Sequence, residues 1–188
     1  MYDCPCDGTW LLRKYIYEER QWHSSNVNDY ANSTIHSYLN STFLTRFDSD
    51  IQDAIKQVKT PYVNGTGSSG SVASSANGLS AKIFLLSGYE VGFLTSVSKY
   101  VPVAGAKLDF FESGITNKTT RIAYLNGTAI NWWLRSPYTE YTNYVWFVYT
   151  NGGSNYRYCS DSYGVRPALV LPSTAVFDKD TLVFKGVK

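Results

Sequence analysis

The stretch NWWLRSPYTEYTNYVWFVYTNGGSNYRYCSDSYGVRPALVL, residues 131–171, organises the rest of this chain. Its two ends, Trp132–Arg135 and Val165–Leu169, are compact and apolar, and each includes one arginine. Between them, the 26 residues from Tyr138 to Tyr163 hold seven Tyr, three Asn, three Ser and three Thr. Large amphipathic rings mixed with small hydrogen-bonding side chains are typical of adaptable binding surfaces. The stretch therefore predicts a rigid frame that presents a polar and aromatic face.

From residue 130 onward the chain has the pattern of antiparallel strands. Two sets of apolar or aromatic residues alternate over 144–149, and the Asn-Gly-Gly turn at 151–153 favours a hairpin with a return strand over 156–158. A further strand is predicted over 165–171, and a small terminal hairpin over 176–184.

Arg135 and Arg166 each lie inside an apolar strand, where an unpaired guanidinium is costly. We expect each to bond loop carbonyls or a carboxylate and so to fix the base of the segment between them. Together with Trp132 and Trp133 they form the predicted structural frame. The alternative is that the two arginines bind an anion.

Two short amphipathic helices are predicted earlier in the chain, after one or two strands within 9–22. The first is capped by Asn32 or Ser33, and its apolar residues recur at helical spacing up to Phe43. The second follows Asp48, and Pro61 is expected to end it.

The middle of the chain gives weaker signals. Residues 64–80 are rich in Gly and Ser and predict a mobile surface loop. Residues 82–87 fit a buried strand or the start of a helix, and 88–130 are expected to be irregular, with one short helix and a turn at 126–127. We therefore expect a single α+β domain over 1–188, with two short helices packed on a small irregular antiparallel sheet. Because a strand-like segment starts at once, we expect it to be the C-terminal part of a longer chain.

Composition and spacing exclude several function classes. The net charge of +2 offers no case for nucleic-acid binding, and no apolar run reaches the roughly 18 residues of a membrane span, so we expect no membrane insertion. Three Cys and two His lack the spacing of a zinc site, and no calcium or phosphate loop is evident. We therefore expect no metal and no cofactor.

The sequence contains no catalytic signature, so we expect no enzyme. His23 falls in a polar loop and His36 on the expected solvent side of a helix, which leaves no basis for a Ser-His-Asp or Cys-His arrangement. Cys4, Cys6 and Cys159 are interpreted as free thiols or small hydrophobic residues, with a disulfide from either of the first two to Cys159 open if the termini meet.

The candidate ligand contacts are the polar and aromatic positions between the two ends of the frame. Tyrosine supplies large contact area at low entropy cost, as in antibody paratopes, although tyrosines on a two-sided strand can instead simply pack. The predicted contacts are Tyr138, Tyr141, Asn143, Tyr144, Phe147, Tyr149, Asn151, Ser154, Asn155, Tyr156, Arg157, Tyr158, Ser160, Asp161 and Tyr163.

Most of the chain resembles a family of bacterial and phage domains of unknown function. The matching pieces are NDYANSTIHSYLNSTFLTRFDSDIQDAIKQV, AKIFLLSGYEVGF, RIAYLNG, WWLRSP and GVRPALVLPS, the last two being the most specific. The resemblance implies a C-type-lectin-like fold of the formylglycine-generating-enzyme type. Some members are similar to proteins varied by diversity-generating retroelements, in which Asn, Tyr, Ser, Asp and Thr accumulate at exposed sites.

Two departures restrict what the resemblance implies. A cysteine pair suited to copper, as in the sulfatase-activating enzymes of that fold, is not evident, and the calcium motifs of animal C-type lectins are absent. The resemblance therefore implies a scaffold that displays a variable surface, without catalysis or calcium-dependent sugar binding.

These observations lead us to expect non-catalytic binding of a protein or glycan ligand on a cell surface. The expected location is a phage virion tail or the bacterial cell surface, with oligomers formed through a parent protein. One alternative is an enzyme on the same scaffold, which would need a deep pocket with convergent His, Cys or carboxylate groups. Another is a structural virion or assembly module that uses the tyrosines as an oligomer contact.

Overall fold

The computed structural model describes residues 8–93, 100–114, 118–178, 180–181 and 183–188. Helix α1 (Thr34–Tyr38) continues into a π-helical turn (Leu39–Phe43) and a 3₁₀ turn (Leu44–Arg46), and α2 (Ser49–Ala54) follows. Two more 3₁₀ turns span Ser75–Asn77 and Thr119–Arg121. The strands are β1 (Gly8–Leu12), β2 (Glu19–Gln21), β3 (Val58–Thr60), β4 (Tyr62–Asn64), β5 (Ser71–Ala73), β6 (Leu79–Ala81), β7 (Ile83–Phe84), β8 (Tyr124–Leu125), β9 (Thr128–Ala129), β10 (Trp132–Pro137), β11 (Tyr144–Val148), β12 (Ser154–Tyr158), β13 (Ser162–Gly164), β14 (Ala168–Pro172), β15 (Ala175–Phe177) and β16 (Phe184–Val187).

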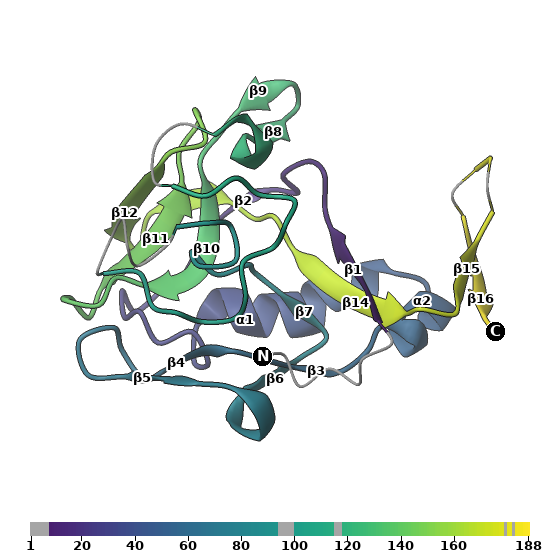
Figure 1. Ribbon diagram of the computed structural model, residues 1–188, viewed down its shortest axis with the longest axis horizontal. Coiled ribbons are helices and arrows are strands. Elements are labelled where there is room, and N and C mark those ends of the chain that lie inside the picture. Colours follow the sequence, from purple (N-terminus) through teal and green to yellow (C-terminus); the bar gives the residue numbers. More distant parts are fainter. Residues whose placement is uncertain (1–7, 94–99, 115–117, 179, 182) are drawn as a thin grey trace.

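The described residues form a mixed structure with short helices and many short strands in small sheets (Figure 1). The largest sheet has the order β12-β11-β10-β13-β2, in which only the β10–β13 pair is parallel. A second sheet, β1-β14-β7, brings residue 8 opposite residue 172. The β15–β16 hairpin stands apart from the body, next to α2 (Figure 1). The α+β prediction is confirmed at this level.

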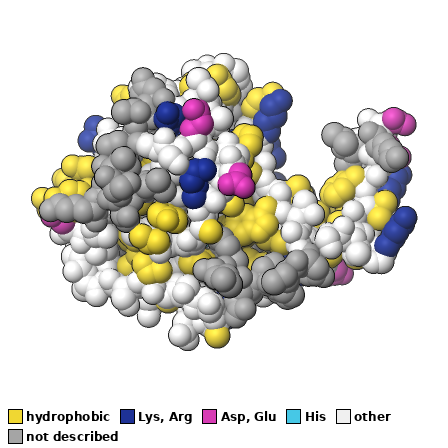
Figure 2. Space-filling view, in the orientation of Figure 1, with side chains coloured by type: hydrophobic (Ala, Val, Ile, Leu, Met, Phe, Trp, Pro, Cys, Tyr) yellow, Lys and Arg dark blue, Asp and Glu magenta, His cyan; other side chains and the backbone are white. Residues whose placement is uncertain are grey.

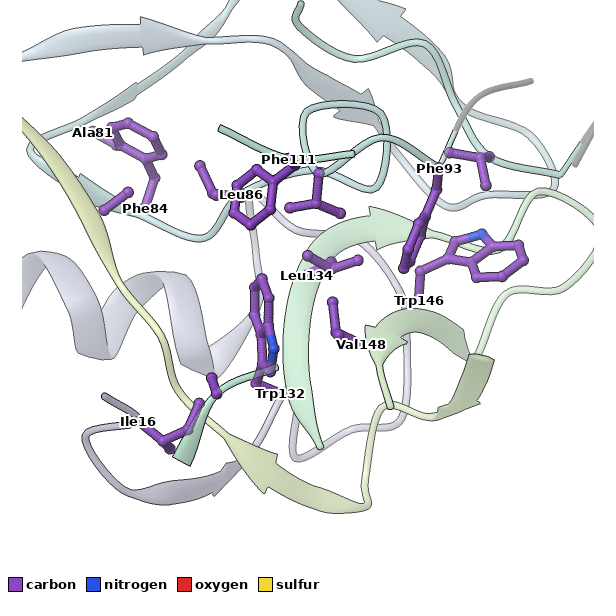
Figure 3. Close-up of a cluster of buried hydrophobic side chains, with 14 of the residues drawn as sticks. Ile16, Ala81, Phe84, Leu86, Phe93, Phe111, Trp132, Leu134, Trp146 and Val148 are labelled. Carbon is purple, nitrogen blue, oxygen red and sulfur yellow. The ribbon is translucent and has the colours of Figure 1, made fainter. Parts of the chain in front are cut away.

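Strand β10 lies at the centre of the core and is buried along its whole length. Successive side chains of a strand point to opposite faces, so Trp132 and Leu134 enter one hydrophobic cluster and Trp133 enters another. Figure 3 shows the first cluster, where Trp132 and Leu134 meet Leu86 and Phe111. A sheet covered on both faces explains why the segment WWLRSP has no polar alternation.

The first predicted helix is confirmed. The hydroxyl of Ser33 accepts a hydrogen bond from the His36 amide at 3.2 Å, which satisfies one free donor of the first turn. The side chains of Ile35, Leu39 and Phe43 are buried on one face of the helical segment. The expected solvent position of His36 is wrong, because its ring packs against Tyr30 and burial lowers its pKa.

The second helix is shorter than expected. It ends at Ala54, and the backbone turns extended at Ile55, so Pro61 does not end it. Val58 lies in β3 and pairs with Ala81 of β6. The cross-strand partner, which is distant in the sequence, overrides the local helical spacing.

The Gly/Ser-rich segment 64–80 is more ordered than predicted. It includes β5, which pairs with β4, and part of β6, which pairs with β3. Gly67 is buried, and a Cβ atom at this position would lie 2.1 Å from the carbonyl oxygen of Tyr138. This glycine therefore permits a close approach of two backbones, and the expectation of a plain mobile loop is corrected.

Other local predictions are confirmed. Residues 83–84 form a buried strand, and Asn126 and Gly127 both have positive φ angles, 50° and 84°, in the turn between β8 and β9.

Cys159 is a free, buried cysteine, whereas Cys4 and Cys6 lie outside the described residues. Among the helices in the described part of the chain, none is long and apolar enough to cross a membrane.

Candidate functional site

The hairpin β11–β12 divides the predicted contacts between two faces. In its antiparallel register, Tyr144 lies opposite Tyr158 and Trp146 opposite Tyr156. Because side chains alternate along each strand, these four aromatic residues share one face of the hairpin. Phe147, paired with Asn155, belongs to the other face.

One face carries a continuous group of tyrosine rings, which we call the tyrosine face. Its closest pair is Tyr138 and Tyr156, with ring centroids 4.2 Å apart, and Tyr144 and Tyr158 are 4.6 Å apart. Tyr141 stacks on Tyr138 at 5.7 Å and meets Tyr144 edge-on at 5.2 Å. Each ring is thus held by at least one other, which limits the side-chain entropy that a ligand would have to freeze.

The tyrosine face is graded from exposed to buried. Tyr141 and Tyr158 are 50% and 43% exposed, whereas Tyr144 and Tyr156 are half-buried. Tyr138 is buried and forms the floor of the group. Beneath it, the indole of Trp146 donates to the carbonyl of Tyr100 at 3.0 Å. The exposed rings therefore stand on a packed aromatic base.

Two tyrosines of the tyrosine face have raised pKa values. Burial raises the pKa of Tyr138 to about 12, and neighbouring Tyr156 adds to the effect. A hydrogen bond with Tyr158, followed by burial, raises the pKa of Tyr144. The hydroxyls of Tyr138 and Tyr144 therefore stay protonated at neutral pH and can both donate and accept hydrogen bonds.

The opposite face of the hairpin is largely core. Phe147 is fully buried, so the expectation that it contacts a ligand is corrected. It packs against Tyr163 at 4.6 Å, and the same tyrosine packs against Trp133 at 4.7 Å. Tyr149 is exposed but contacts Phe147 on this second face. The prediction rested on composition and ignored the alternation of side chains along strand β11, which turns Phe147 into the core.

Several predicted polar contacts serve the local backbone. The side-chain oxygen of Asn151 accepts from the Gly153 amide at 3.0 Å in the hairpin turn, and that of Asn155 accepts from the Tyr156 amide at 2.8 Å. The backbone amide of Ser160 donates to Asn26 at 3.3 Å. The remaining predicted positions are exposed or half-buried: Asn143, Ser154, Arg157 and Asp161.

The thiol of Cys159 lies behind the 143–158 segment and donates to the carbonyl of Asn143 at 3.1 Å. Burial raises its pKa to about 12. Since the thiolate is the reactive form, this cysteine is inert at neutral pH and acts as a small packed residue.

The frame is anchored by a buried ion pair. Both terminal nitrogens of Arg135 donate to the carboxylate of Glu90, one of them at 2.7 Å, and both side chains are fully buried. Arg135 also donates to the carbonyls of Pro61 and Leu85, at 2.8 Å and 2.7 Å. Burial raises the pKa of Glu90, and the guanidinium opposes that shift. Arg135 thus makes the contacts of a structural arginine, because its guanidinium is already bonded to Glu90 and to two backbone carbonyls.

Asn28 also positions the tyrosine face, and the sequence reading did not find it. Its side-chain nitrogen donates to the carbonyls of Tyr141 and Tyr144 at 2.8 Å and 2.7 Å, and its oxygen accepts from the Gly67 amide at 2.9 Å. Its own amide donates to the Thr142 carbonyl at 2.7 Å. No local pattern marks this residue, because Tyr141 lies 113 positions away.

Tyr100 is the second residue that was missed. Its ring lies 4.9 Å from that of Tyr138, so it extends the floor of the tyrosine face. It falls in the glycine-punctuated region 88–130, where the only available signal was its aromatic character.

No group of three or more His, Cys, Asp or Glu side chains in the described part of the chain could hold a metal ion. Comparison with known proteins found no match among curated proteins and none among solved structures. A family model does match residues 7–173, which include both ends of the frame and the whole tyrosine face. The chain therefore belongs to the family described as domain of unknown function DUF6273.

Proposed function

We propose that this chain is a non-catalytic binding domain whose tyrosine face contacts a protein or glycan ligand on a cell surface. The observation that carries the proposal is the joined group of tyrosine rings, exposed at Tyr141 and Tyr158 and packed below on Tyr138 and Trp146. Tyrosine is enriched at binding hot spots because its ring buries much area while its hydroxyl finds a hydrogen bond.

Rigidity of the base supports the proposal. The rings of Tyr144, Tyr156 and Tyr158 project from two strands in register, and Asn28 bonds the backbone of the turn that precedes β11. A site that is already ordered loses less entropy when a ligand binds.

The finer parts of the proposal rest on composition and on the resemblance. The exposed or half-buried positions of the 138–163 segment include Asn, Ser, Asp, Thr and Tyr, which are the residues that a diversity-generating retroelement would accumulate, together with one Glu and one Arg. The scaffold would be C-type-lectin-like, a proposal supported by short helices packed beside small antiparallel sheets. Display on a phage tail or bacterial surface, through a parent protein, is proposed on the basis of the same resemblance.

The test is a pair of matched double variants. Tyr141→Ala/Tyr158→Ala removes the two exposed rings, and Tyr15→Ala/Tyr124→Ala removes two rings of similar exposure, 53% and 41%, on other segments. Binding of the labelled domain is measured on a glycan array and on intact bacterial cells, followed by affinity measurement with any glycan found. The first variant should lose roughly 100-fold or more in affinity, since hot-spot rings contribute about 2 kcal/mol each.

Both variants should keep the melting temperature of the wild type, because exposed side chains contribute within about 0.5 kcal/mol. Equal binding by the first variant and the wild type would remove the tyrosine face from the proposal. A large loss of stability in the first variant would show instead that the rings are core. Self-association that the first variant abolishes, seen by light scattering, would favour the assembly module.

A further inference from the structure

A second site is suggested by a cavity of about 700 Å³ that shares no lining residue with the tyrosine face. Its walls come from β1, the start of β14 and the segment 108–111, and hydrophobic side chains gather at the surface in the middle of the face shown in Figure 2. Most of the lining is apolar and includes Trp10, Leu12, Leu108, Phe110 and Phe111. The volume falls within the roughly 300–1,000 Å³ typical of small-molecule sites.

Arg166 gives this apolar cavity a buried positive charge. It is 5% exposed, and its Nε donates to the carbonyl of Arg13 at 3.0 Å. Its guanidinium carbon lies 4.9 Å from the ring centre of Trp132. Its Nη1 is buried and has no hydrogen-bond partner among the residues that the structure describes. A buried cationic donor without a partner is unfavourable, so this nitrogen is suited to donate a hydrogen bond to an anion.

The other charges of the lining lie at its rim. Lys14 and Asp109 are both exposed and of opposite sign, so Arg166 remains as the buried charge. Burial lowers the pKa of Arg166 to about 10, which still leaves it protonated at neutral pH. The lining thus combines apolar walls with a single buried cation.

We propose that this cavity binds a small amphipathic carboxylate, with its apolar body against Trp10, Leu108 and Phe110 and its carboxylate on the guanidinium of Arg166. A monoanion matches one available cationic donor, whereas a phosphate would bring more charge into apolar walls than Arg166 can compensate. A neutral apolar ligand would leave Nη1 unpaired. Arg135 cannot take part, because its guanidinium is already paired with Glu90. Of the two arginines considered as an anion-binding pair, Arg166 therefore remains.

The experiment compares decanoate with decanol, which have the same chain length and differ in charge. Isothermal titration calorimetry on the wild-type domain should show at least roughly tenfold tighter binding of decanoate, the size expected for a hydrogen bond to a charged group. Arg166→Gln keeps a donor for the Arg13 carbonyl, and it should reduce the preference for decanoate to about twofold or less. The Tyr141→Ala/Tyr158→Ala variant should bind decanoate as the wild type does.

A variant at the mouth of the cavity keeps the test informative if Arg166→Gln does not fold. Phe110 is 65% exposed, so Phe110→Asp should fold normally and weaken decanoate much more than decanol. Failure of decanoate to bind, or equal affinity for decanol in the wild type, would overturn the proposal. So would an unchanged preference in a folded Arg166→Gln protein, or loss of decanoate binding in the tyrosine-face variant.

Discussion

Replacement of Asn28 tests whether a residue that touches no ligand controls the tyrosine face. Asn28→Ala removes the two donors that hold the carbonyls of Tyr141 and Tyr144 and the acceptor of the Gly67 amide. The Tyr144 carbonyl keeps a second donor, the Tyr138 amide at 2.9 Å. The variant therefore leaves the Tyr141 carbonyl and the Gly67 amide without that partner.

An unsatisfied buried group costs about 1–3 kcal/mol, and the Tyr141 carbonyl is partly open to water. We expect Asn28→Ala to reduce the free energy of unfolding by about 2–4 kcal/mol. For a chain of this size that corresponds to a fall in melting temperature of about 4–16 °C. Because the 138–144 turn loses its tie, affinity for the ligand of the tyrosine face should fall as well.

The measurement is urea unfolding followed by circular dichroism, with Asn32→Ala as the matched control. Asn32 is exposed and bonds Asp29 at 2.8 Å, so its replacement should change stability by about 0.5 kcal/mol or less. A loss below about 1 kcal/mol for Asn28→Ala would refute the reasoning, since it would mean that neither group depends on the amide.

Two further predictions follow from buried ionisable groups. Glu90→Gln leaves the guanidinium of Arg135 uncompensated and should destabilise the protein by about 3–5 kcal/mol in urea unfolding. The control, Glu112→Gln, replaces an exposed carboxylate and should have little effect. A loss below about 1 kcal/mol in Glu90→Gln would contradict this prediction. Burial raises the pKa of Tyr30 to about 12, so its contribution to stability is complete below the unfolded-state pKa of about 10 and is lost as pH rises from there to about 12. Urea unfolding at increasing alkaline pH should show this fall, less steeply in Tyr30→Phe, and equal slopes in the two proteins would count against it.

The α+β character and the hairpins were predictable because their signals are local. The Asn-Gly turn at 126–127 needs positive φ angles, which these residues adopt readily, and both have them. The helix that begins after Ser33 was predictable from its cap and from the spacing of its apolar residues. The central buried strand was signalled by a run without polar alternation, apart from Arg135.

Other expectations failed where a distant partner overrode the local pattern. Val58 has helical spacing from Ile51, yet it pairs with Ala81 in a strand. Gly67 lies in a segment whose composition indicates mobility, yet it packs against the backbone of Tyr138. Phe147 lies in the tyrosine-rich segment, yet its position in the strand directs it into the core. Each error concerns a contact that no window of neighbouring residues contains.

Local chemistry in the amino-acid sequence was enough to place a tyrosine-rich hairpin between two apolar, arginine-containing ends. Folding sorted those tyrosines, because hairpin register brings Tyr144, Tyr156 and Tyr158 to one face and turns Phe147 away. Folding also supplied Glu90 for Arg135 and left Arg166 beside a cavity. Side-chain type is a property of each residue alone, whereas facing, burial and pairing depend on segments that meet only in three dimensions.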